Sequence, residues 1–187
     1  MPDTSKPTRE ELAAAYGSTI PDVGGPQTRI LLVGINPSLW SGWSGRHFAR
    51  PGNRFWRTLH LSGLTPELLG PYDDTAVRAA GLGITNLVAR ATARADELSA
   101  EEVRAGIDPL RQLVARWRPA FVAFLGISTY RIALARPKAT VGEQPESIEG
   151  ARVWVLPNPS GLNASYQQPA LTAAYAQLRD AATERSP

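Results

Sequence analysis

The sequence predicts one α/β domain, a three-layer sandwich in which helices flank a mainly parallel, four-stranded central sheet. Short apolar runs alternate along the chain with segments whose apolar residues recur at helical spacing. The runs are nearly continuous, as in parallel strands that are covered on both faces. A chain of 187 residues is long enough for one such domain and too short for two ordinary ones.

The four predicted strands are the short apolar runs at residues 29–34, 83–88, 121–126 and 152–156. The first and the last run end in similar Asn-Pro signals, within GINPS and LPNPS. Ligands of open α/β sheets bind in the crevice outside the carboxyl ends of the strands. We expect the first and last strands to be neighbours across a switch point, which would bring these two loops together.

The predicted helices fall between and around these strands. Residues 99–117 form one long helix, because Ser99 and Glu102 make a capping box before an apolar face. Further helices are predicted from Thr8, at residues 53–62 with Asn53 as cap, within 73–80, at 128–135 and at 168–184. Residues 136–150 are rich in Pro, Gly and Glu and are predicted as a loop, at most with an irregular strand.

The domain is expected to span residues 29–187, after a peripheral N-terminal segment of residues 1–28 in which 20–27 read as a linker. No run is long enough to span a membrane, and residues 1–10 lack the apolar centre of a signal peptide. We therefore expect a cytoplasmic protein without a membrane partner. We also expect it to be a monomer.

The absence of cysteine excludes disulfides, a thiolate nucleophile and an iron–sulfur cluster held by Cys. His47 and His60 are the only histidines and lack metal-ligand spacing, so neither a metal nor another cofactor is expected.

The net charge of +3 comes almost entirely from arginine, since Lys6 and Lys138 are the only lysines. Arginine suits contacts to DNA phosphates, although a genomic preference for arginine explains the bias as well. Four arginines near the first Asn-Pro signal could line a phosphate-binding rim: Arg46, Arg50, Arg54 and Arg57.

Asn36 follows the first strand directly, and Pro37 favours an extended Asn36 backbone with its side chain held in one direction. The loop after it carries Trp40, Trp43, His47 and Phe48. Such a loop suits a functional site, and the alternative is a surface connection whose aromatic side chains enter the core.

Three blocks carry a family resemblance: GINPS at 34–38, FARPGNRFW at 48–56 and LPNPSGLN at 156–163. They resemble the mismatch-specific uracil/thymine DNA glycosylases, a branch of the uracil-DNA glycosylase superfamily, and the resemblance runs from about residue 29 to residue 178. It implies the fold of those enzymes and a monofunctional DNA glycosylase. Such an enzyme flips uracil, preferably from G·U mismatches, out of double-stranded DNA and hydrolyses the N-glycosidic bond, leaving an abasic site for base excision repair.

The resemblance also implies roles for residues of the first two blocks. Asn36 would be catalytic and position the attacking water, and Phe48 would stack on the flipped base, or alternatively be an ordinary core aromatic. Backbone groups of Ile35 and Phe48 would read the polar edge of uracil, with Asn53 as a further substrate-binding residue. Ser41 stands where thymine-active members carry a smaller Ala, so the pocket is expected to crowd a 5-methyl group and to remove thymine poorly.

The loop of residues 158–163 resembles the family's wedge into DNA. Leu162 would fill the hole left by the flipped nucleotide, and Gly161 would let the backbone meet the widowed guanine. The other DNA-binding candidates in this loop are Asn158, which stands where other branches place a His, together with Ser160 and Asn163.

A carboxylate after the second strand would help to activate the water, and Asp96 is the candidate, with Glu97 beside it. The alternative is that both residues only favour the dipole of the next helix. Asn86 stands where some bacterial relatives have a lysine and is given a supporting polar role.

Two other functions compete with a glycosylase. One is a non-catalytic module that binds DNA mismatches or abasic sites. The other is a small-molecule α/β enzyme, but no Gly-rich phosphate loop follows a strand. Lyase activity is not expected, because neither lysine lies in a motif suited to a Schiff base.

Overall fold

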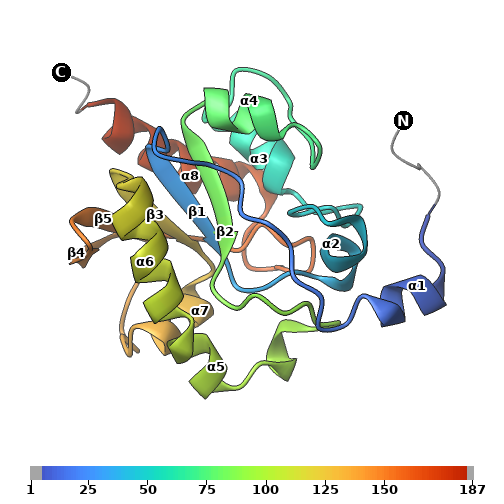
Figure 1. The fold of residues 1–187 in the computed structure, drawn as a ribbon. Helices are drawn as coiled ribbons and strands as arrows, with labels where there is room; N and C mark the ends of the chain where they lie inside the picture. The colour runs from blue at the N-terminus through green and yellow to red at the C-terminus, as the bar shows by residue number, and fades with distance from the viewer. Residues whose placement is uncertain (1–5, 185–187) are drawn as a thin grey trace.

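The computed structural model describes residues 6–184 and has a single central sheet (Figure 1). Its strands lie in the order β2-β1-β3-β5-β4. Four strands are parallel, and β4 pairs with β5 in the antiparallel direction. The strands are β1 (Ile30–Gly34), β2 (Leu82–Asn86), β3 (Phe121–Leu125), β4 (Gly142–Ile148) and β5 (Ala151–Leu156).

The prediction of a mainly parallel sheet is confirmed, but the predicted number of four strands is wrong, because β4 adds a fifth strand. The sequence of β4, GEQPESI, is polar and contains Pro145, which argues against a central strand. An edge position tolerates both features, since β4 pairs only with β5 and its register shifts between Glu143 and Ser147.

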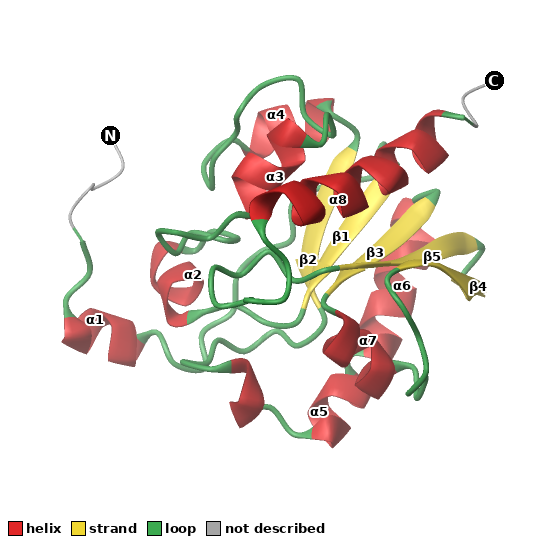
Figure 2. Cartoon of the chain, turned by 180° about the vertical axis from the view of Figure 1, so that it is seen from behind, coloured by secondary structure: helices red, strands yellow, loops and turns green. Residues whose placement is uncertain are grey.

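Helices cover both faces of the sheet, which confirms the three-layer prediction (Figures 1 and 2). On one face, Leu32 packs in a core with Phe55 and Leu171. On the other, Leu31 packs in a core with Leu110 and Val114. The first face is covered by α3 (Phe55–Leu61), α4 (Asp74–Ala79) and α8 (Gln168–Thr183), and the second by α5 (Ala100–Ala105), α6 (Ile107–Trp117) and α7 (Ile127–Ala133).

The single helix predicted over residues 99–117 is two helices, α5 and α6, that meet at Gly106. The capping box of Ser99 and Glu102 begins α5 as predicted. A Cβ atom at Gly106 would lie 2.3 Å from the carbonyl oxygen of Leu87. The backbone that follows β2 therefore packs directly against the junction of α5 and α6, where only glycine fits. Helical periodicity carries no signal of such a contact between backbones.

Two short helices lie near the amino terminus, α1 (Arg9–Ala14) and α2 (Leu39–Ser44). The first has the predicted capping box of Thr8 and Glu11. The second lies in the region predicted as a plain loop, where the hydroxyl of Ser38 accepts a hydrogen bond from the amide of Ser41. This is an N-cap that sequence reasoning overlooked.

The segment predicted to be a linker runs along the edge of the sheet. Val23 is buried and forms an antiparallel bridge with Ile84 of β2. The hydroxyl of Thr85 donates to the Asp22 carboxylate at 2.6 Å. Residues 20–23 therefore act as a partial cover for β2, and the division of the chain at residue 28 stays a prediction.

The prediction that β1 and β5 are neighbours is wrong, because β3 lies between them. Their following loops nevertheless share one edge of the sheet, since β1, β2, β3 and β5 all run in the same direction. The chain passes from β1 to β2 on one side and returns to β3 on the other, so the strand order reverses beside β1. Ligand crevices of open α/β sheets form at such a switch point.

Candidate active site

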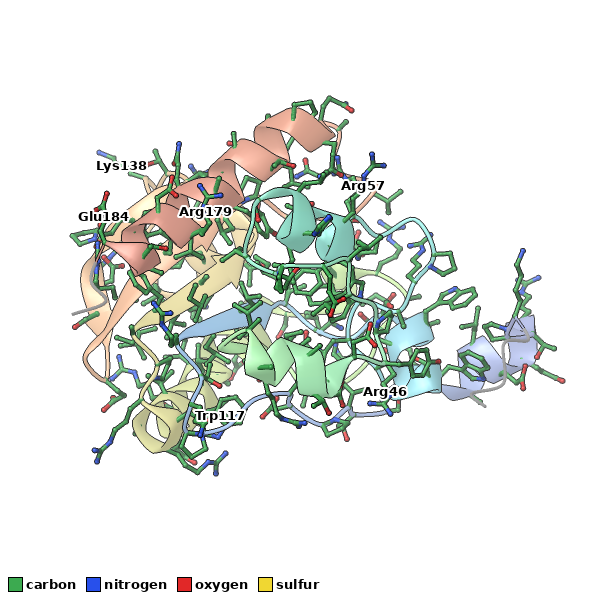
Figure 3. All side chains as sticks on the ribbon, turned by 90° about the horizontal axis from the view of Figure 1, so that it is seen from above. Arg46, Arg57, Trp117, Lys138, Arg179 and Glu184 are labelled. Carbon is green, nitrogen blue, oxygen red and sulfur yellow. The ribbon has the colours of Figure 1, made fainter. Side chains whose placement is uncertain are left out.

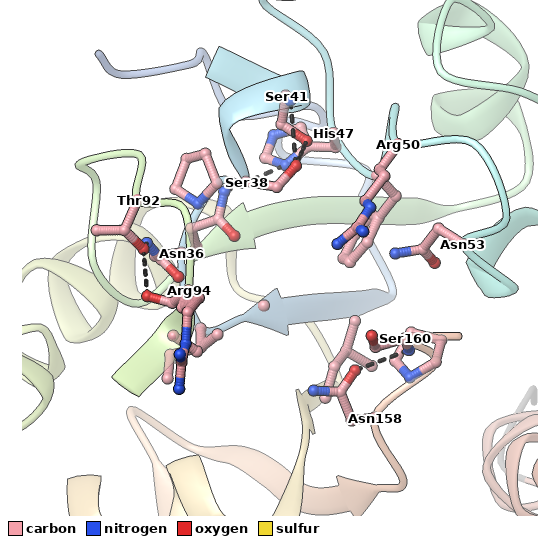
Figure 4. Close-up of a pocket in the computed structure, with 18 of the residues that line it drawn as sticks. Asn36, Ser38, Ser41, His47, Arg50, Asn53, Thr92, Arg94, Asn158 and Ser160 are labelled. Carbon is pink, nitrogen blue, oxygen red and sulfur yellow. Dashed lines mark hydrogen bonds between the residues drawn. The ribbon is translucent and has the colours of Figure 1, made fainter. Parts of the chain in front are cut away.

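A cavity of about 380 Å³ lies outside the carboxyl ends of the parallel strands (Figure 4). Its volume falls within the range of small-molecule sites. Among the predicted site residues, Gly161 and Asn163 lie outside this cavity and line adjacent hollows. All the others line it: Ile35, Asn36, Ser41, Phe48, Asn53, Asp96, Asn158, Ser160 and Leu162.

The amide of Asn36 is held in one orientation. Its Nδ2 donates to the backbone oxygen of Arg90 at 3.0 Å and to the hydroxyl of Thr92 at 2.8 Å. A backbone carbonyl can only accept, so the NH₂ group must face Arg90. The hydroxyl of Thr92 in turn donates to the backbone oxygen of Arg94 at 2.8 Å, which leaves it an acceptor for Asn36 (Figure 4).

The carbonyl oxygen of Asn36 is thus the free end of the amide. No hydrogen bond to this Oδ1 atom occurs within residues 6–184, and Asn36 lines the cavity. Thr92 is a residue that sequence reasoning missed. Its position in the loop after β2, at the same sheet edge as Asn36, is the signal that could have identified it.

His47 is buried between the backbone of Pro21 and the amide of Asn86. Its Nε2 lies 2.9 Å from the backbone oxygen of Pro21, and its Nδ1 lies 3.4 Å from the Nδ2 of Asn86. Because the carbonyl can only accept, Nε2 carries the proton and Nδ1 accepts from Asn86. Burial lowers the pKa of His47 below its ordinary 6.5, which favours this neutral form.

Asn86 consequently has a fixed amide as well. With its Nδ2 directed to His47, its Oδ1 lies over Gly34, where a Cβ atom would approach that oxygen to 2.6 Å. Gly34 and Asn86 both line the cavity. Glycine is therefore needed at the end of β1, and the pair of His47 and Asn86 offers a defined donor and acceptor that the sequence did not reveal.

Phe48 is placed for stacking. Its ring lies on that of Phe55, with centroids 3.8 Å apart and planes at 19°, while it also lines the cavity. The backbone of Phe48 has a φ of 50°, which is unfavourable for a bulky residue and concentrates at functional sites. The core therefore supports one face of the ring, and the part of the ring that lines the cavity is suited to stack on a planar ligand.

Ser41 and Asn53 form parts of the cavity wall. Ser41 is buried on α2, with its Oγ 3.2 Å from that of Ser38. The Oδ1 of Asn53 accepts from the amide of Phe55 at 2.9 Å, but the N-cap of α3 is Arg54, so the predicted cap is displaced by one residue. This bond leaves the NH₂ group of Asn53 as its donor toward the cavity.

Asp96 lies on the exposed rim, in the short 3₁₀ helix Ala95–Glu97, and forms an ion pair with Arg94. Its role as a second water-activating group stays a prediction, and the ion pair occupies one of its oxygens. Glu97 has a local function, because its carboxylate accepts from the backbone amide of Arg94 at 2.7 Å.

The loop that joins β5 to α8, residues 157–167, is here called the β5–α8 loop. Within it, Oδ1 of Asn158 accepts from the amide of Ser160 at 2.8 Å, and Nδ2 of Asn163 donates to the oxygen of Asn158 at 2.9 Å. Leu162 is 79% exposed at the tip. A Cβ atom at Gly161 would lie 2.9 Å from the Gly52 oxygen, so the loop touches the second sequence block, residues 48–56.

The prediction of a phosphate-binding rim of four arginines is wrong for Arg54 and stays a prediction for the other three. Arg46 pairs with Asp74 at 2.7 Å, and Arg54 donates to backbone oxygens of the β5–α8 loop. Arg50 lines the cavity mouth, and Arg57 is exposed on α3, well separated from Arg46 (Figure 3). Arg46 stays partly exposed in its ion pair, so Arg46, Arg50 and Arg57 remain candidates for phosphate contacts.

Residues 6–184 bring together no group of three or more His, Asp or Glu side chains that could hold a metal ion. None of the helices in this part of the chain has the length and apolar character needed to cross a bilayer.

A solved structure of similar fold comes from Methanosarcina acetivorans, an NMR structure of a protein that carries a provisional assignment as a uracil DNA glycosylase. It superimposes with a TM-score of 0.60, is 20% identical, and the match covers 87% of this chain and 98% of that one. At this identity the match shows the fold. The model of the uracil DNA glycosylase superfamily matches residues 21–179, which include every predicted site residue. This chain therefore belongs to the uracil DNA glycosylase superfamily.

Proposed function

We propose that this protein is a DNA glycosylase that removes uracil from double-stranded DNA, preferably opposite guanine, and leaves an abasic site. Membership of the superfamily supports uracil as the target, and the resemblance of the three sequence blocks supports the mismatch-specific branch. The observation that carries the proposal is the fixed amide of Asn36, whose oxygen faces the cavity without a protein partner among the described residues.

Asn36 positions the attacking water. Cleavage of a base from deoxyribose passes through a cationic, oxocarbenium-like sugar, so a weak nucleophile is sufficient if it is well placed. The Asn36 oxygen accepts a hydrogen bond from water and aims it at the anomeric carbon, but an amide cannot take up the proton. The proposal therefore predicts slow chemistry that depends on positioning.

The cavity distinguishes uracil from cytosine through Asn86. Its Oδ1 accepts from N3–H of uracil, and the hydrogen of its Nδ2 that is not directed to His47 donates to a uracil carbonyl oxygen. Cytosine has a lone pair at N3, which would face the Asn86 oxygen. An unpaired contact of this kind discriminates strongly between ligands of the same shape.

The departing uracil carries negative charge, which neutral donors must stabilise. Because the Oδ1 of Asn158 is held by the amide of Ser160, the NH₂ group of Asn158 is directed elsewhere and serves as a donor at the cavity wall. Phe48 supports the base from one side. Asn158 thus supplies part of the stabilisation that a histidine supplies in other branches.

The preference for a mismatch follows from base flipping. Extrusion of a nucleotide costs a few kcal/mol and costs least where pairing is already weak. Leu162, exposed at the tip of the β5–α8 loop, is the side chain suited to fill the vacated space. Ser41 lines the cavity, and its side chain would crowd the 5-methyl group of thymine, so thymine is a poorer substrate than uracil in this proposal.

A mismatch- or abasic-site-binding module is the second candidate. One observation favours it. Asp96 is the acidic residue among the described residues that line the cavity, and it is ion-paired with Arg94. A site without a free general base can bind a flipped nucleotide and cleave it slowly or not at all.

Single-turnover reactions on labelled duplexes separate the two candidates. Duplexes with U·G, U·A, U·C or T·G are incubated with excess protein, and released base and alkali-labile sites are quantified. The proposal predicts free uracil, fastest from U·G, with an alkali-labile strand and no strand cleavage before alkali. Tight binding to the U·G duplex without uracil release would establish the binding module instead.

A further inference from the structure

The guanidinium of Arg54 lies among the backbone oxygens of the β5–α8 loop. Its Nε lies 3.4 Å from the oxygen of Pro159, and one terminal nitrogen lies 2.6 Å from that of Tyr166. The other terminal nitrogen lies 2.6 Å from the oxygen of Ser160 and 3.2 Å from that of Asn163. The backbone amide of Arg54 adds a bond to Pro159 at 3.2 Å.

These four oxygens flank Leu162 on both sides along the chain. Pro159 and Ser160 precede it, whereas Asn163 and Tyr166 follow it. One rigid, planar group therefore joins the two arms of the loop that carries the exposed leucine. The five N–H donors of an arginine fork allow this, while a lysine has a single nitrogen with three donors.

The location of Arg54 indicates that its charge serves this loop. Arg54 is the N-cap of α3, where a positive charge opposes the helix dipole and where no side-chain cap bond forms. The α3 helix itself gains nothing from the arginine side chain. Its guanidinium is also engaged by protein oxygens, which leaves it unsuited to the phosphate contact expected from the sequence.

We infer that Arg54 is a positioning residue that pre-forms the β5–α8 loop, so that Leu162 meets the duplex already oriented. The inference rests on the proposed function and assigns to Arg54 a role in flipping. Ordering a loop before binding removes a cost that would otherwise be met on the DNA. Arg54 directly follows Asn53 in the sequence, and Asn53 lines the cavity, so the bonds of Arg54 link this loop to the cavity wall.

The test combines Arg54→Met with Leu162→Ala in a double-mutant cycle, measured as single-turnover uracil release from a U·G duplex. Arg54→Met removes all four side-chain hydrogen bonds to the loop and is expected to slow release by roughly 10- to 100-fold, because water partly replaces the lost bonds. In the Leu162→Ala background, the same change is expected to cost less than about threefold, because both residues act through one loop. Arg111→Met, exposed on α6 across the sheet, is the matched control and leaves the rate unchanged.

Hydrogen exchange of the free protein supplies a readout that is independent of activity. In Arg54→Met, amides of residues 159–166 are expected to exchange at least about tenfold faster, while those of β1 stay protected. Arg54→Lys keeps the positive charge but lacks the planar guanidinium, and it is expected to show the same faster exchange as Arg54→Met. It replaces Arg54→Met if the absence of a thermal unfolding transition shows that Arg54→Met does not fold.

The inference would be overturned if the rate losses of Arg54→Met and Leu162→Ala multiply in the double variant. It would also be overturned if the amides of residues 159–166 exchange in Arg54→Met at the wild-type rate. A wild-type protein that releases no uracil would refute the proposed function, and in that case the exchange experiment alone decides whether Arg54 orders the loop. The two failures are therefore distinguishable.

Discussion

Replacement of Thr92 by valine tests how the water-positioning amide is held. Thr92 is buried, and its hydroxyl accepts from Nδ2 of Asn36 and donates to the oxygen of Arg94, both at 2.8 Å. Valine keeps the shape and removes both bonds. Asn36 then retains only its bond to the backbone oxygen of Arg90, at 3.0 Å.

The magnitude follows from the lost bonds. A hydrogen bond within a protein contributes about 1 kcal/mol net, so two lost bonds destabilise the fold by about 2 kcal/mol. The amide of Asn36 loses one of its two anchors, and about 1 kcal/mol in the barrier corresponds to a roughly fivefold slower reaction. Complete loss of the water-positioning group in Asn36→Ala is expected to cost far more.

The assay is single-turnover uracil release from a U·G duplex at saturating protein, alongside urea denaturation of each variant. Thr92→Ser, which restores the hydroxyl, is the matched control and is expected to recover most of the rate. A Thr92→Val rate equal to wild type, or as low as that of Asn36→Ala, would refute this account of how the amide is oriented.

Three further predictions concern the cavity. Phe48→Ala removes the stacking surface and is expected to weaken binding of a U·G duplex by about tenfold, measured by fluorescence anisotropy. Phe48→Tyr is expected to keep the affinity, and a Phe48→Ala variant that binds as tightly as wild type would contradict the stacking role. Ser41→Ala is expected to raise T·G excision relative to U·G by at least about threefold, and an unchanged ratio would exclude steric crowding by this side chain. The pKa of buried His47 is lowered in the fold, so below pH 6.5 the unfolded chain binds a proton that the folded protein does not. The free energy of unfolding is therefore expected to fall as pH drops from 6.5 towards the lowered pKa, and a His47→Gln variant with the same pH slope would contradict this.

The sequence predicted the parts of the fold that depend on local pattern. Nearly continuous apolar runs identified β1, β2, β3 and β5, and capping boxes located the starts of α1 and α5. The polar strand β4 was predicted only as an irregular strand within the loop of residues 136–150, and the break at Gly106 was missed. Each depends on a tertiary neighbour: β5 in one case and the backbone of Leu87 in the other.

The candidate site divides in the same way. Asn36, Phe48 and Leu162 were identified because each belongs to a sequence block with recognisable spacing, and the structure brings all three to one cavity. Thr92 and the pair of His47 and Asn86 matter only through hydrogen bonds between different strands and loops. No spacing along the chain encodes these contacts.

Arg54 illustrates the limit most clearly. Its charge and its neighbours suggested a phosphate contact, since a sequence does not reveal whether a guanidinium faces solvent or protein. The structure directs it to four backbone oxygens that lie more than 100 positions away along the chain. The charge of an arginine is therefore a poor guide to its role when its partners are backbone groups.

The most direct test of the account compares wild type with Asn36→Ala on a U·G duplex, with binding and single-turnover release measured separately. The account predicts that release slows by roughly 100-fold or more while the dissociation constant changes by less than about threefold, because positioning of water affects the transition state and contributes little to binding. Release that survives in Asn36→Ala would contradict the central claim, and its loss in Asp96→Asn would assign activation of the water to that carboxylate.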